Sequence, residues 1–75
     1  MTTTAYKRRF EFIEGNSSKF WEIEVAGKEV TVRYGRNGTS GQTLAKVFSD
    51  VLSANLHANK KIAEKVSKGY CEVNE

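Results

Sequence analysis

Hydrophobic and polar residues alternate along the first half of the chain, a period typical of strands with one buried face. The alternation runs through residues 6–14, 21–25 and 30–34, and more weakly through residues 42–48. Turn-forming residues at 15–18 and 27–28 separate the first three segments, so we expect consecutive antiparallel strands. Phe20 falls on the otherwise polar face of the second segment, so it is either exposed or covered by another part of the chain.

From residue 49 the pattern changes to the spacing of an amphipathic helix. Its expected apolar stripe repeats every four residues and consists of Ala54, Ala58, Ile62 and Val66, extended by Val51 and Leu52. Ser49 is the expected N-cap and Gly69 the expected residue after the helix. The predicted fold class is α+β: an antiparallel sheet of about four strands, one C-terminal helix packed on a face, and room for a short final strand at residues 70–73.

A length of 75 residues allows one domain. We expect a flexible N-terminal arm in residues 1–8 and a single domain in residues 9–75. The chain shows no signal peptide and no apolar run long enough for a membrane span, and it contains a single cysteine. These features favour a cytoplasmic protein with no membrane partner.

Candidate groups for catalysis or metal binding are few. Cys71 and His57 are the only soft metal ligands, too few for a zinc site, so we expect neither a metal nor a cofactor. They are also the only candidate pair for a thiol nucleophile and its base, and they fall on different predicted elements, so we expect no enzyme activity. Glu22 and Glu24 share the outer face of one strand and are expected to be solvated.

The net charge is +3, which permits contact with nucleic acid without requiring it. The lysines that recur at roughly helical spacing are Lys60, Lys61, Lys65 and Lys68. A solvated helix face explains most of them, but the helical wheel places Lys65 at the edge of the apolar stripe, where its stem should pack along the sheet. Arg33 alternates with Val32 and Tyr34 and therefore lies on the other face of its strand.

Residues 32–42, VRYGRNGTSGQ, contain three glycines spaced three apart. A phosphate-binding P-loop is excluded, because Gln42 rather than lysine follows Gly41 and a strand-like segment comes next. Asn37-Gly38 is the strongest two-residue signal for a hairpin, because both residues tolerate positive φ. A hairpin alone does not explain why Tyr34 and Arg36 stand beside it.

Several separated blocks resemble one family in the correct order. They are KFWEIEV at residues 19–25, VTVRYGRNGTSGQT at 30–43, KVFSD at 46–50 and EKVSKGY at 64–70. Together they resemble a WGR domain, whose Trp-Gly-Arg triplet falls at Tyr34-Gly35-Arg36 in this chain. The resemblance covers residues 10–73, and its most specific parts are the glycine-rich segment and the closing residues 64–70.

The resemblance implies a small antiparallel sheet with a covering helix and a domain that is not catalytic. In poly(ADP-ribose) polymerases, this domain contacts DNA near a strand break through the Trp and Arg of the triplet. Carried over by position, Tyr34 would offer an aromatic face, Gly35 a close backbone approach, and Arg36 a guanidinium to a phosphate. Tyr34 replaces the tryptophan with a smaller ring and shares strand parity with Val30 and Val32, so it is either a site residue or part of the core.

The sequence therefore predicts a non-enzymatic nucleic-acid-binding module that contacts DNA near ends or nicks. Tyr34, Gly35 and Arg36 would make the central contacts, and Arg33 and Lys65 would add phosphate contacts. The alternative is a protein-interaction module that docks another protein or domain through an exposed sheet edge or through the face that carries Phe20. The sequence leaves the oligomeric state open.

Overall fold

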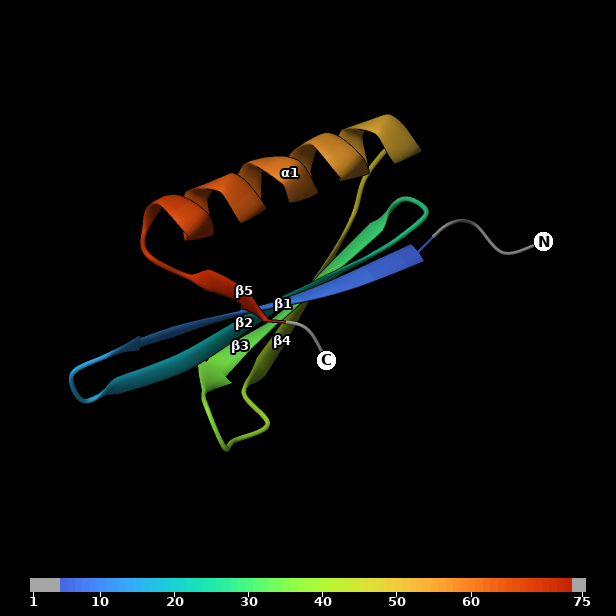
Figure 1. Ribbon diagram of the computed structural model, residues 1–75. Helices are drawn as coiled ribbons and strands as arrows, with labels where there is room; N and C mark the ends of the chain where they lie inside the picture. Colours follow the sequence, from blue (N-terminus) through green and yellow to red (C-terminus); the bar gives the residue numbers. More distant parts are fainter. Residues whose placement is uncertain (1–4, 74–75) are drawn as a thin grey trace.

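The computed structural model describes residues 5–73 as one sheet with a helix across one face (Figure 1). Its elements are β1 (Ala5–Glu14), β2 (Ser17–Ala26), β3 (Glu29–Arg36), β4 (Gln42–Val47), α1 (Val51–Ser67) and β5 (Cys71–Val73). The strands are antiparallel in the order β4-β3-β2-β1-β5. The predicted α+β class is confirmed, with the short final strand as a fifth strand beside β1.

Two tight turns set the register of the first three strands. Gly15 and Gly27 take positive φ angles of 58° and 64° where β1 meets β2 and β2 meets β3. The resulting alternation turns one set of side chains toward α1. The buried core formed there consists of Phe10, Trp21, Ile23, Val25, Val30, Ala54, Ala58 and Ile62. We call the opposite side of the sheet, which α1 does not cover, the far face (Figure 1).

The helix buries a narrower stripe than the four-residue repeat predicts. The buried residues of α1 are Ala54, Ala58 and Ile62. Val66 and Leu52 are 52% and 68% exposed, and Val51 is also exposed, so the prediction was wrong for these three. The stripe is centred near Ala58, and at 100° per residue Leu52 points about 120° and Val66 about 80° away from that direction.

The helix begins one residue later than expected. Asp50, rather than Ser49, is the N-cap: its backbone is extended and its carboxylate accepts a hydrogen bond from the Ser53 amide at 2.7 Å. At the other end, Lys68 is the C-cap and Gly69 follows with a φ of 105°, as predicted.

The N-terminal arm expected in residues 1–8 overlaps the first strand. β1 starts at Ala5, so residues 5–8 belong to the sheet and not to an N-terminal arm, while residues 1–4 lie outside the described part of the chain. Tyr6 packs against the core, and Arg8 donates hydrogen bonds of 2.8 and 2.7 Å to the Glu72 carboxylate on β5. These contacts hold the start of β1 in place.

Candidate nucleic-acid interface

The glycine-rich segment forms the loop between β3 and β4, in residues 37–41. The expected hairpin is confirmed, but its loop is longer than the two-residue turn that Asn37-Gly38 predicts, and Asn37 is not at positive φ. Gly38 makes the turn in open space, with a φ of 93°. Gly35 and Gly41 pack against each other: a Cβ on Gly35 would lie 2.8 Å from the Gly41 Cα. The close approach at Gly35 is therefore to the chain's own loop.

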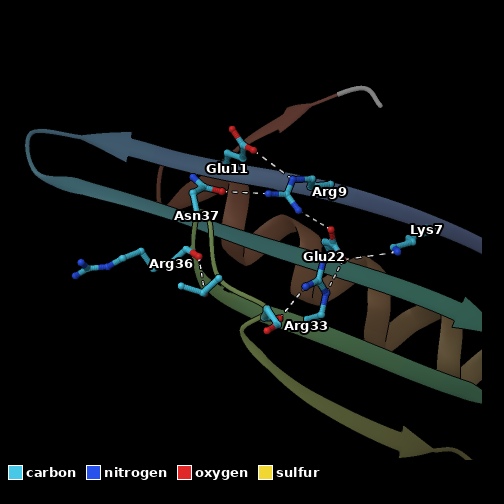
Figure 2. Close-up of polar contacts among 9 residues, drawn as sticks. Lys7, Arg9, Glu11, Glu22, Arg33, Arg36 and Asn37 are labelled. Carbon is cyan, nitrogen blue, oxygen red and sulfur yellow. Dashed lines mark hydrogen bonds and ion pairs between the residues drawn. The ribbon is translucent and has the colours of Figure 1, made fainter.

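Arg36 ends β3, and its guanidinium points away from the loop (Figure 2). Its side chain is exposed and makes no ion pair within residues 5–73. Its carbonyl oxygen accepts hydrogen bonds from the Thr39 amide at 3.1 Å and the Thr39 hydroxyl at 2.7 Å. Lys19 is its partner on β2, so two cationic residues stand next to each other near this end of the sheet.

Tyr34 lines a groove of about 340 Å³ between α1 and the β3–β4 side of the sheet. The other lining residues are Trp21, Val32, Leu44, His57, Lys61, Glu64, Lys65 and Lys68. Tyr34 is half-buried and packs against the core, and its hydroxyl donates to Gln42 Oε1 at 3.1 Å. The Tyr34 ring therefore packs against the core and also lines the groove, and its role as a site residue stays a prediction.

Lys65 contributes to this groove and to a second one of about 240 Å³, which is lined by Phe12, Lys19, Lys65, Lys68 and Tyr70. Lys65 is half-buried, and its ammonium lies 5.7 Å from the centre of the Trp21 ring and 5.2 Å from that of Tyr70. Burial, with the positive charges of Lys68 and Lys61, holds the pKa of Lys65 below its ordinary value. An anion bound beside Lys65 would offset these costs.

His57 lies on the helix side of the first groove, with its ring centre 4.8 Å from that of Phe48. Burial, together with the charges of Lys46, Lys61 and Lys60, lowers the pKa of His57. The neutral imidazole is therefore favoured near pH 7 unless an anion enters the groove.

Cys71 is exposed on β5 opposite Glu11, on the far face, whereas His57 lies on the helix. The two residues are therefore separated by the sheet. Across residues 5–73, no group of three or more His, Cys, Asp or Glu side chains is placed to bind a metal ion. The described helix is also too short and too polar to cross a membrane.

Arg33 lies on the far face, away from Tyr34, Arg36 and Lys65. It forms an ion pair with Glu22 at 3.0 Å and donates from Nη1 to the Ser40 carbonyl oxygen at 2.7 Å. Glu22 was expected to be solvated but is only 4% exposed, because cationic side chains from the neighbouring strands cover it. The structure thus places Tyr34 and Lys65 in one groove on the helix side and Arg36 on the same side of the sheet, beside Lys19, while Arg33 lies on the other side.

Phe20 is 2% exposed, so the alternative that it is covered is confirmed. The guanidinium carbons of Arg9 and Arg33 lie 4.7 and 4.9 Å from its ring centre, and a Cβ on Gly41 would come within 2.8 Å of the ring. The far face therefore offers no apolar Phe20 surface for docking. One exposed edge of the sheet is β4, all of whose residues are exposed.

Three residues of the second groove were not predicted from the sequence: Phe12, Lys19 and Tyr70. A signal for Lys19 was present in the chain. The turn at Gly27-Lys28 joins β2 to β3, and counting outward from it along both strands places Lys19 opposite Arg36.

Comparison with known proteins gives a consistent result. The WGR domain model matches residues 6–75. The chain is 43% identical over 65 residues to protein YehF of Escherichia coli, covering 87% of this chain and 24% of that protein. It is 38% identical over 66 residues to the uncharacterized protein YfeS of the same organism, covering 88% of this chain and 27% of YfeS.

A crystal structure of a Bacteroides fragilis protein has the same fold, with a TM-score of 0.89 and 49% sequence identity. The match covers 92% of this chain and 20% of that one. The chain therefore spans about a quarter of the length of the curated relatives it matches. Because the family model covers essentially the whole sequence, the chain belongs to the WGR domain family.

Proposed function

We propose that this chain is a non-enzymatic nucleic-acid-binding module that contacts DNA near ends or nicks. One observation carries the proposal: cationic and aromatic side chains gather on the helix side, near the C-terminal end of α1. The cationic residues are Lys19, Arg36, Lys61, Lys65 and Lys68, and the aromatic ones are Phe12, Trp21, Tyr34 and Tyr70. Glu64 is the only carboxylate lining the two grooves, and it pairs with Lys61 at 3.5 Å.

This combination suits a nucleic acid strand. Lysine and arginine contact phosphates and release counterions, while aromatic rings contact sugars and bases. Arg36 is exposed and can donate two parallel hydrogen bonds to one phosphate. In a closed duplex each base is covered on both faces, whereas an end exposes one face and a nick lets the stack open more easily. A half-buried ring such as Tyr34 therefore favours these sites.

A second candidate function is protein docking through β4. This strand forms one edge of the sheet, and its Leu44 and Val47 are 60% and 71% exposed. An exposed edge can pair with a strand from another protein or domain. Such binding would be largely insensitive to salt. The cytoplasmic location stays a prediction under either function.

Fluorescence polarisation with blunt, nicked and end-closed duplexes, at several salt concentrations, tests the DNA proposal. We expect tighter binding to the blunt and nicked duplexes. The logarithm of the binding constant should fall linearly with the logarithm of the salt concentration, with a slope of about −0.9 per phosphate contacted. Arg36→Ala should reduce affinity by roughly 10- to 150-fold, from the usual 1.5–3 kcal/mol of a hydrogen bond to a charged group.

Lys28→Ala is the matched control for Arg36→Ala. Lys28 is also exposed and cationic, but it lies in the turn between β2 and β3, far along the sheet from Arg36. We expect its affinity and salt slope to stay close to those of the unmodified protein. Equal effects of the two substitutions, or no binding at low salt, would contradict the proposed site.

A further inference from the structure

We infer that a charge cluster on the far face holds the glycine-rich loop in the conformation that presents Arg36. We call it the far-face cluster; it consists of Glu22, Arg9 and Arg33, with Lys7 beside them (Figure 2). The inference rests on the proposed function, because it concerns how the same binding site is positioned. The cluster residues act through the loop and are positioning residues.

Glu22 is the centre of the cluster. Its carboxylate accepts hydrogen bonds from Arg9 Nη1 at 2.6 Å and from Arg33 Nε at 3.1 Å, and Lys7 Nζ lies 3.8 Å away. Burial opposes its ionisation, but the hydrogen bonds from Arg9 and Arg33 outweigh it, and the pKa of Glu22 falls below its ordinary value. Glu22 is therefore a carboxylate at neutral pH and contacts both guanidinium groups, while Glu11 also accepts a hydrogen bond from Arg9 Nε at 3.2 Å.

Both guanidinium groups also reach the loop. Arg33 Nη1 donates to the Ser40 carbonyl oxygen at 2.7 Å, and Arg9 Nη2 donates to Asn37 Oδ1 at 3.1 Å. The Asn37 side-chain amide in turn donates to Ser18 Oγ at 2.9 Å, and its backbone amide donates to the Ser18 carbonyl at the same distance. Asn37 and Ser40 lie on either side of the loop's turn, so the cluster ties it at two points.

Holding the loop in place also fixes the position of the Arg36 backbone. Arg36 directly precedes Asn37, and its guanidinium extends away from the cluster while its backbone is held beside it (Figure 2). A loop that is ordered before binding loses less conformational entropy when it meets its ligand. The far-face cluster thus favours DNA binding without touching the DNA.

Glu22→Gln and Glu24→Gln form a matched pair that separates positioning from charge. Glu24 lies two residues along the same strand on the same face, is exposed, and makes no ion pair within the described residues. Each substitution removes one negative charge from a chain of net charge +3, so charge alone predicts tighter DNA binding for both. Positioning predicts that Glu22→Gln weakens binding to nicked duplex by about tenfold, while Glu24→Gln does not.

Amide hydrogen exchange measured by NMR without DNA supplies a readout that does not depend on the proposed function. We expect the Asn37 and Thr39 amides, which donate to Ser18 and Arg36, to exchange faster in Glu22→Gln, while amides in the centre of the sheet are unchanged. Should Glu22→Gln fail to fold, Arg33→Lys replaces it. That lysine keeps the charge beside Glu22 but cannot reach both Glu22 and Ser40.

The outcomes distinguish failure of the positioning role from failure of the proposed DNA binding. Protected loop amides in the variant, or Glu22→Gln binding DNA as tightly as Glu24→Gln, would overturn the positioning role. If the unmodified protein shows no affinity for DNA, the proposed function fails, and the loop exchange alone then decides whether the cluster orders the loop.

Discussion

Replacing Gly41 by alanine tests how the loop packs. Gly38→Ala is the matched control, because both glycines have positive φ but only Gly41 is closely surrounded by other atoms. The two glycines have φ angles of 72° and 93°, a region that costs other residues roughly 1–2 kcal/mol. A Cβ on Gly38 would meet no atom within 4 Å. A Cβ on Gly41 would overlap the Tyr34 carbonyl oxygen and lie 2.8 Å from Cζ of Phe20.

The contacts set the expected difference in the free energy of unfolding. Gly38→Ala should lower it by the strain alone, about 1–2 kcal/mol. Gly41→Ala adds the cost of forcing an atom into filled space, about 1–3 kcal/mol, for a total of roughly 2–5 kcal/mol. The free energy of unfolding of a small domain is often little more than about 5 kcal/mol, so Gly41→Ala should lose much of its stability.

Urea unfolding followed by tryptophan fluorescence measures both values, because Trp21 is the single tryptophan and is 4% exposed. The expected order of stability is the unmodified protein, then Gly38→Ala, then Gly41→Ala. Equal losses for the two variants would show that Gly41 does not pack against Phe20 and the backbone of Tyr34.

Three further predictions concern the helix cap, the buried carboxylate and the groove lysine. Asp50→Ala should cost about 0.5–2 kcal/mol in thermal melts, and Ser49→Ala less than about 0.5 kcal/mol; equal costs would contradict the observed N-cap. The pKa of Glu22 is lower in the folded protein than in the unfolded chain, so its ionised form stabilises the fold. This stabilisation is fully present above the unfolded pKa of about 4.3 and is lost as pH falls through the folded pKa. Glu22→Gln should therefore flatten the decline of Tm in acid, and an unchanged slope would argue against its pairing. The pKa of Lys65 is also lowered, which means that its charge disfavours folding at neutral pH. Lys65→Met should therefore not lower Tm, whereas loss of the charge should weaken DNA binding; a lower Tm would assign Lys65 a structural role.

The fold was predictable because its signals are local. Gly15 and Gly27 mark short turns, and the alternation between them leaves one register for β1, β2 and β3. The helix was recognisable from Ala54, Ala58 and Ile62. Which apolar residues beside this stripe stay exposed was not, because the helical repeat does not say how much of the helix surface the sheet covers.

The site was predictable only in part. The resemblance and the residue spacing pointed to Tyr34, Arg36 and Lys65, which the structure places on one side of the sheet. The burial of Glu22 was missed because it depends on Arg9 and Arg33, which are distant in sequence and meet it only across the strands. The same strand pairing could have been counted from the turns, which would have shown that a carboxylate faces two arginines.

NMR titration of the isotope-labelled protein with a nicked duplex would locate the DNA-binding surface residue by residue. We expect amide shifts to concentrate at Tyr34, Arg36, Lys65 and Lys68, on the helix side, and to weaken as salt is raised. Shifts confined to β4, or no shifts at low salt, would show that the helix-side surface has a role other than DNA binding.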